Sequence, residues 1–149
     1  MAEDQTSDPD APAEVGDDTA GPATDPAVDT RRWPVVVVVI DQTVEGDRIE
    51  AVTAALDDVL RRRERIGVVF DYGRGPMEAQ QRISMWLAER VDALRVLVPA
   101  AVTVVAPERL DHIRSMIDSG MFTMPFESWA TATVDDGVAW VSERLPSTD

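Results

Sequence analysis

Six consecutive β-branched apolar residues, VVVVVI at positions 35–40, constrain the fold of this chain more than any other feature. A strand with one exposed face alternates apolar and polar residues, whereas a run that is apolar throughout is typical of a strand buried on both faces. Two more apolar runs follow at residues 66–70 and 101–106, and each interval is long enough for a helix. Strands that alternate with helices predict an α/β domain with a mainly parallel sheet.

The segments between these runs have helical periodicity. Apolar residues recur every three or four positions after Asp47, which we expect to be the N-cap of a first helix. A second helix is predicted from about residue 77 to residue 96, and a short third helix follows the third strand. Residues 126–134 are predicted to form a fourth strand, and Asp135 or Asp136 caps the last helix. We therefore expect a sheet of about four strands with helices packed on it.

The first 31 residues differ in composition from the rest of the chain. Residues 1–30 contain nine acidic residues and no basic residue, and their sizeable apolar side chains are Val15 and Val28. Such a segment cannot bury enough surface to offset the entropy of ordering it, so we predict a disordered acidic tail over residues 1–31. The domain is expected at residues 32–146, with a disordered C-terminus at 147–149. The tail either keeps the protein soluble or docks to a partner.

Charge and composition exclude several classes of partner and of chemistry. The net charge of −14 repels nucleic acids and anionic membranes, so we expect neither as a partner. No apolar run approaches the ~18 residues of a membrane span, and the N-terminus lacks a secretory signal. We therefore expect a cytoplasmic protein. All 14 basic residues are arginine, which excludes the lysine of a P-loop or of a Schiff base.

Catalytic sets are also missing. The chain has no cysteine and a single histidine, His112, so metal sites built on cysteine or paired histidines are excluded. It has no Gly-x-Ser-x-Gly nucleophile elbow. The first apolar run is followed by Asp41-Gln42-Thr43, which lacks the second acid of a haloacid-dehalogenase-type phosphotransferase. We therefore expect no enzymatic activity, no metal and no cofactor.

Polar residues after the predicted strands form one candidate ligand site. Asp41 and Asp71 follow two strands, and open α/β sheets bind ligands at this edge. Arg74, flanked by glycines, and Arg82, on the following helix, have the planar forks that recognise anions. Together with Glu108, the two aspartates also have the oxygen donors that Mg²⁺ prefers. The alternative is that these acids are ordinary loop residues and that Arg74 pairs with Asp71 or Glu78.

A second candidate site is the apolar segment at residues 116–129. It is rich in methionine and aromatic residues, and methionine-rich surfaces adapt to several partner shapes. If exposed, the segment is large enough to mark an interface, which the last predicted helix could extend. The alternative is ordinary core packing. The candidate interface residues are Met116, Met121, Phe122, Met124, Phe126, Trp129 and Trp140.

Four short motifs carry a family resemblance over residues 33–145. They are the strand that closes on Asp71 before a glycine-rich loop, the helical QQRISMW, the strand AVTVVAP, and the terminal DDGVAWV with Trp140. In their order these elements resemble the small bacterial STAS-like, or SpoIIAA-like, domains. The resemblance implies a regulatory or protein-binding fold without enzymatic activity. It does not extend to a phosphorylation switch, because the loop DYGRGP holds no serine and Ser84 lies inside the helix.

The leading hypothesis is therefore a non-enzymatic STAS-like module for protein interaction or regulation, whose partner is another protein or a second copy of itself. The alternative is a domain that binds a small ligand or anion in the crevice at the strand ends. A degenerate phosphotransferase-like enzyme comes third. An exposed apolar segment with a filled crevice favours the first hypothesis, and a deep crevice with a buried segment favours the second.

Overall fold

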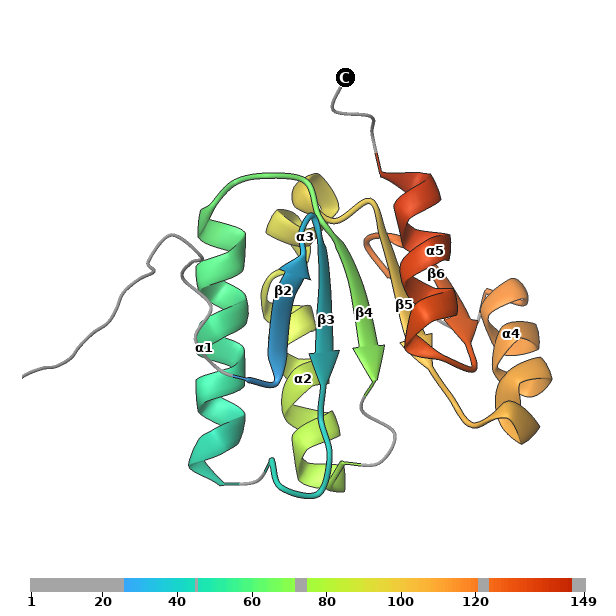
Figure 1. Ribbon diagram of the computed structural model, residues 1–149, viewed down its shortest axis with the longest axis horizontal. Helices are drawn as coiled ribbons and strands as arrows, with labels where there is room; N and C mark the ends of the chain where they lie inside the picture. Colours follow the sequence, from blue (N-terminus) through green and yellow to red (C-terminus); the bar gives the residue numbers. More distant parts are fainter. Residues whose placement is uncertain (1–25, 45, 72–74, 121–123, 146–149) are drawn as a thin grey trace, which may run out of the picture.

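The computed structural model describes residues 26–44, 46–71, 75–120 and 124–145. It is an α/β domain built on a five-stranded sheet in the order β2-β3-β4-β5-β6 (Figure 1). β2 pairs antiparallel with β3, and the other neighbours pair in parallel. The strands are β2 (Val28–Arg32), β3 (Val35–Val39), β4 (Gly67–Asp71), β5 (Ala100–Val104) and β6 (Glu127–Thr131).

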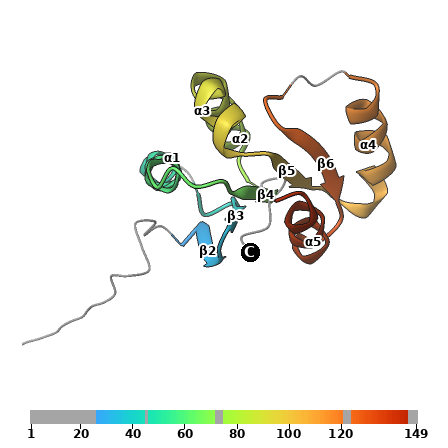
Figure 2. The ribbon, with the colours of Figure 1, turned by 90° about the horizontal axis from the view of Figure 1, so that it is seen from above.

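Helices connect the parallel strands, as the spacing of the apolar runs predicted. They are α1 (Asp47–Arg61), α2 (Met77–Glu89), α3 (Val91–Leu97), the 3₁₀ turn η2 (Pro107–Arg109), α4 (Leu110–Asp118) and α5 (Val134–Arg144). Viewed along the sheet, α1, α2 and α3 cover one face and α5 lies on the other (Figure 2). None of the described helices is long and apolar enough to cross a membrane.

Two hydrophobic clusters, one on each face of the sheet, hold these layers together. In β3, Val36 and Val38 belong to the larger cluster, which includes residues of α1, α2 and α3. Val35 and Val37 belong to the smaller cluster, together with Val141 of α5. Val35 to Val38 are therefore buried from both sides, as predicted, and fix β3 in the interior of the sheet, whereas Val39 at the end of the strand is exposed.

The fifth strand, β2, is a correction to the sequence analysis. Its residues were assigned to the tail over residues 1–31, of which residues 1–25 lie outside the described part, as do 147–149. Val28 is buried against the larger cluster, whereas the strand ends on the exposed Arg31 and Arg32. Charged side chains are common on edge strands because they discourage pairing with other chains. Because of these charged residues, the sequence pattern did not predict a strand here.

Three further local predictions were wrong. The helix expected over residues 77–96 breaks at Arg90, which leaves helical geometry with φ −122° and ψ 26°. The guanidinium of Arg90 bonds to Asp57 of α1, with 3.0 Å between Nη2 and Oδ2. Asp47 is the first residue of α1 and makes no capping bond. In α5, the side chain of Thr133 caps the helix by accepting a bond from the Asp136 backbone N–H, 3.1 Å away.

Candidate functional site

An apolar groove lies between α4 and the sheet, with a cavity of about 180 Å³. Its floor and walls come from β4, α2, β5, α4 and β6, so residues far apart in the sequence meet there. Apolar side chains predominate, and the hydroxyls of Thr103 and Ser128 add polar atoms. The lining residues are Phe70, Leu87, Ala101, Thr103, Val105, Ile113, Ile117, Met124, Phe126, Ser128 and Trp129.

Small side chains on the sheet explain why a hollow forms here. Ala101 of β5 and Ser128 of β6 are paired in register, and both line the groove. Neither side chain is large enough to fill the space beneath the helices. The neighbouring strand positions Thr103 and Ala130 are also paired in register and are likewise small. The sequence of the two strands therefore leaves a shallow floor under the gap between α2 and α4.

Helix α4 forms the outer wall of the groove and is held away from the main layer of helices (Figure 2). It packs against β6 and η2. Arg114 links it to the edge strand: its Nε donates to the Ala130 carbonyl oxygen at 2.9 Å, and its guanidinium lies 4.7 Å from the centre of the Trp129 ring. This link holds α4 beside the edge strand β6, so that α4 does not pack closely on the face of the sheet.

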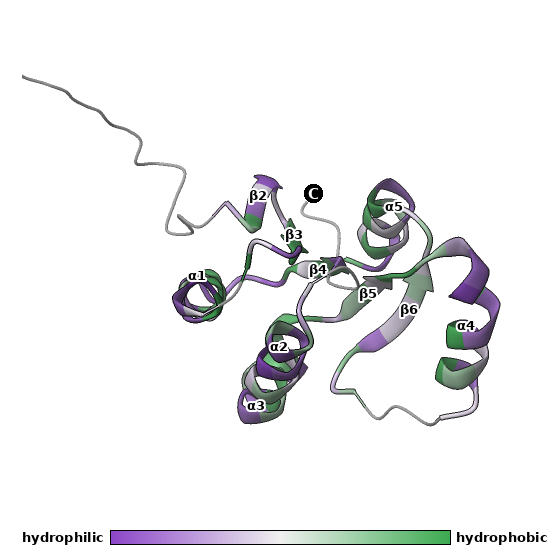
Figure 3. Ribbon diagram, turned by 90° about the horizontal axis from the view of Figure 1, so that it is seen from below, coloured by the Kyte–Doolittle hydropathy of each residue, from purple (hydrophilic) through white to green (hydrophobic). Residues whose placement is uncertain are grey.

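The apolar face of α4 remains incompletely covered. Leu110, Ile113 and Ile117 recur at helical spacing on one side, and Figure 3 shows the resulting mixture of hydrophobic and hydrophilic residues along α4. Yet none of the nine residues of α4 is buried. An amphipathic helix of a globular domain normally buries its apolar stripe against the core. In α4, Ile113 and Ile117 of that stripe instead line the groove.

The structure brings together part of the predicted interface. Met124, Phe126 and Trp129 line the groove, and Met124 is 42% exposed. Met116 lies half-buried on α4, next to the groove residue Ile117. Met121 and Phe122 lie outside the described residues.

Trp140 does not extend this surface. It packs against the smaller hydrophobic cluster, on the face of the sheet that α5 covers. The guanidinium of Arg144, one helical turn later, lies 3.7 Å from the centre of its ring. The predicted extension of the interface to Trp140 is therefore not formed in the monomer.

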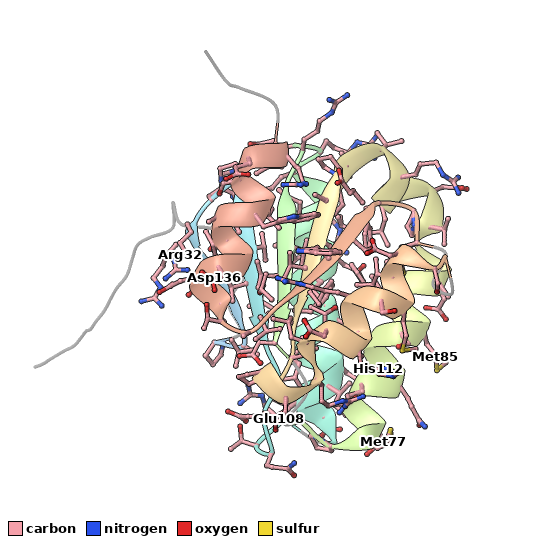
Figure 4. The ribbon with its side chains drawn as sticks, turned by 90° about the vertical axis from the view of Figure 1, so that its right-hand side faces the viewer. Arg32, Met77, Met85, Glu108, His112 and Asp136 are labelled. Carbon is pink, nitrogen blue, oxygen red and sulfur yellow. The ribbon has the colours of Figure 1, made fainter. Side chains whose placement is uncertain are left out.

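A second depression, of about 620 Å³, lies at the carboxyl ends of β4, β5 and β6. Asp71 lines it, together with Glu108, Arg109 and Thr133, and the lining is more polar than that of the groove. Figure 4 shows Glu108 on the surface at this end of the molecule and His112 nearby on α4. The crevice expected at the strand ends is therefore present, and it is wide.

The predicted ligand residues do not line one common pocket. Asp41 is exposed, and its Oδ1 accepts bonds from the Thr43 backbone N–H at 2.8 Å and from the Thr43 hydroxyl at 2.5 Å. These two hydrogen bonds lower the pKa of the Asp41 carboxyl. Arg82 lines a separate groove with Arg90, and Arg74 lies outside the described residues. Asp41 thus bonds within its own turn, and of the three candidates that the structure describes, Asp71 lines the crevice.

Within residues 26–44, 46–71, 75–120 and 124–145, no three acidic or histidine side chains are grouped so that they could hold a metal ion. His112 is exposed on α4.

Sequence reasoning missed the groove, although one signal for it was present. The spacing of Leu110, Ile113 and Ile117 predicted an amphipathic helix, but the partner of its apolar face could not be read from the sequence. Phe70 and Leu87, on the opposite wall, looked like ordinary core residues. Only the three-dimensional placement of α4 beyond β6 shows that these faces are separated by a hollow.

The fold and the groove define a class of protein, an α/β domain with a five-stranded mixed sheet and an open apolar face beside its last crossover helix. Comparison of the chain with protein-family models, with curated proteins and with solved structures finds no match.

Proposed function

We propose that this protein is a non-enzymatic regulatory module of the STAS-like type that binds another protein, or a second copy of itself, through the groove beside α4. One observation carries the proposal: α4 is amphipathic, yet Ile113 and Ile117 of its apolar stripe line a cavity of about 180 Å³ and none of the residues of α4 is buried. A cytoplasmic location is part of the proposal.

The energetics of burial favour an occupant for this surface. Ile113, Ile117 and Met124 are each half-buried or exposed, so a partner that covers them removes further apolar area from water. Covering three such side chains contributes on the order of 3 kcal/mol before the cost of association. The flexible side chain of Met124 can also adapt to the shape of a partner. An apolar groove of this kind is typical of binding surfaces.

The arrangement of the sheet supports the STAS-like assignment. The parallel strands follow one another in chain order, with helices as crossovers, and this is compatible with the order of elements on which the resemblance rests. The absence of lysine and cysteine in the chain is in keeping with a role without catalysis.

A second candidate function is the binding of a small polar ligand in the crevice at the strand ends. Two observations favour it: the volume of that crevice, about 620 Å³, and the placement of Asp71, Arg109 and Thr133 around it. Open α/β sheets commonly bind ligands at this edge. Because Arg82, the predicted anion-binding arginine that the structure describes, does not line the crevice, we rank this function second.

The test is affinity purification from the native cell with three full-length baits. The baits are the wild type, Ile117→Asp in the groove, and Ser115→Asp on the exposed part of the same helix. A protein that binds the wild type and Ser115→Asp, but not Ile117→Asp, supports the proposal once its direct binding is measured with purified components. Light scattering of the three chains tests self-association in the same way.

Circular dichroism must show that Ile117→Asp keeps its helical content, so that lost binding reflects the groove. Two results together would show that the groove binds no protein. All three baits would recover every partner equally, and light scattering would find each of the three chains to be a monomer. Partners lost instead on substitution of Arg109 would place protein binding in the crevice and not in the groove, and would contradict the proposal.

A further inference from the structure

The groove has the size and chemistry to receive one particular kind of side chain. Resting on the proposed function, we infer that the partner inserts a single tyrosine side chain into the cavity, from a segment with basic residues on either side. The inference depends on two features of the groove, its volume and the position of its hydroxyls, and on the negative charge of the chain.

The volume fits one aromatic ring. The cavity of about 180 Å³ is slightly larger than the roughly 150 Å³ apolar cavity that binds benzene in a well-studied protein. A phenol ring therefore fits. Phe70 and Phe126 line the cavity, and aromatic rings attract one another in edge-to-face or offset geometry.

The polar atoms of the floor favour a ring that carries a hydroxyl. Thr103 and Ser128 belong to adjacent strands, on the face that lines the groove. The Ser128 hydroxyl donates to the Phe126 carbonyl oxygen over a long 3.4 Å, which leaves its oxygen able to accept a bond. A purely apolar ring would cover these hydroxyls without replacing their hydrogen bonds to water, and that is unfavourable. A tyrosine hydroxyl reaching the floor replaces them.

The charge of the chain favours a partner segment with positive charge. Glu108, Asp111 and Asp118 are exposed on α4 and in the turn that precedes it, although none of them lines the groove. The guanidinium of Arg114 is engaged by Trp129 and by the Ala130 carbonyl oxygen. The chain as a whole carries a net charge of −14, which attracts basic segments and repels acidic ones.

The experiment measures binding of short peptides to the full-length ¹⁵N-labelled protein by NMR at low salt. The probes are acetyl-Arg-Tyr-Arg-amide, its Phe and Ala analogues, acetyl-Glu-Tyr-Glu-amide, and free p-cresol. We expect saturable shifts of amides in α4, β5 and β6 with the Arg-Tyr-Arg peptide. We expect affinity weaker by about threefold with phenylalanine, from the loss of one hydrogen bond, and no shifts there with alanine.

Matched variants test the site itself. Ser128→Leu fills the floor and is expected to abolish binding, whereas Ser115→Leu adds the same side chain on the exposed part of α4 and is expected to leave it unchanged. Ser128→Ala keeps the cavity open and removes one hydroxyl. It should bring the tyrosine and phenylalanine peptides to similar affinity, and it remains informative if Ser128→Leu fails to fold.

Each outcome decides the inference. Binding of p-cresol without binding of the Arg-Tyr-Arg peptide would identify a site for free small aromatic molecules and overturn the inference. Equal binding of the Glu-Tyr-Glu peptide would overturn the basic flanks, and absence of shifts with every probe would overturn the ring site. In that last case a partner that still depends on Ile117 leaves the proposed function standing, so the two failures are distinguishable.

Discussion

Each of the four tryptophans of the chain lies beneath an arginine side chain. The pairs, with the distance from guanidinium carbon to ring centre, are Trp33 with Arg62 (4.2 Å), Trp86 with Arg90 (5.1 Å), Trp129 with Arg114 (4.7 Å) and Trp140 with Arg144 (3.7 Å). A planar guanidinium stacks on an aromatic face in a way that an ammonium group does not. In a chain without lysine, these pairs shield large apolar rings at the rim of both hydrophobic clusters.

A prediction at this scale concerns Asp29 of β2. Its carboxylate accepts three bonds from Arg31, from the backbone N–H at 2.9 Å and from Nε and Nη2 at 3.0 and 2.8 Å, and these lower the pKa of Asp29 to about 2. In the unfolded chain the pKa is near 3.8. The folded state therefore gains stability above about pH 4 and loses it as the pH falls towards 2.

We expect the substitution Asp29→Asn to reduce the loss of unfolding free energy between pH 4 and pH 2, as measured by urea unfolding. The Arg31 side chain is 88% exposed, so solvent screening limits the effect to less than about 1 kcal/mol. Asp92→Asn, at a fully exposed carboxylate, controls for the removal of one negative charge. An unchanged pH dependence in Asp29→Asn would show that the ion pair does not persist in solution.

At the scale of elements, the contact between α5 and β4 depends on a missing side chain. A Cβ atom built on Gly67 would lie 1.8 Å from Cγ1 of Val141, which is fully buried. Replacing glycine by alanine within a strand is ordinarily favourable. We expect the opposite for Gly67→Ala, a destabilisation of about 1–3 kcal/mol in urea unfolding, because α5 must move away from the sheet.

The double variant Gly67→Ala/Val141→Ala provides the control, since it removes the atom that the new methyl group meets. We expect it to be less destabilised than the sum of the two single variants. Additive single effects would show that α5 does not pack on Gly67 as described.

The elements also show what sequence can and cannot predict. The runs that became β3, β4 and β5 were predicted because a strand buried on both faces needs no knowledge of its neighbours to be recognised. The break at Arg90 depends on Asp57, 33 residues away, and so lay outside any local pattern. Two of the tryptophan pairs, Trp86 with Arg90 and Trp140 with Arg144, have the four-residue spacing of helical neighbours, whereas the other two join distant elements.

For the molecule as a whole, the position of α4 determines which apolar side chains are exposed on the surface. The sequence predicted an apolar segment at residues 116–129 and could not decide between core packing and exposure. That choice depends on where α4 stands relative to α2, and no property of either helix alone determines it. The strand-end crevice was predicted from topology, yet Arg82 lines a different groove, because side-chain direction on a helix depends on the packing of that helix.

The boundary between tail and domain supplies the last prediction. Val28 is buried, and the Ala27 carbonyl oxygen accepts a bond from the Val39 backbone N–H at 2.9 Å, so residues from 27 onwards belong to the folded unit. A chain beginning at residue 26 should therefore keep the unfolding free energy of the full chain to within about 0.5 kcal/mol. A chain beginning at Trp33 loses β2 and exposes the edge of β3, whose apolar side chains favour pairing with another copy. We expect that chain to be less stable in urea and to form dimers or larger species in light scattering. A stable monomer beginning at Trp33 would contradict the placement of β2 and restore the longer tail that composition alone predicted.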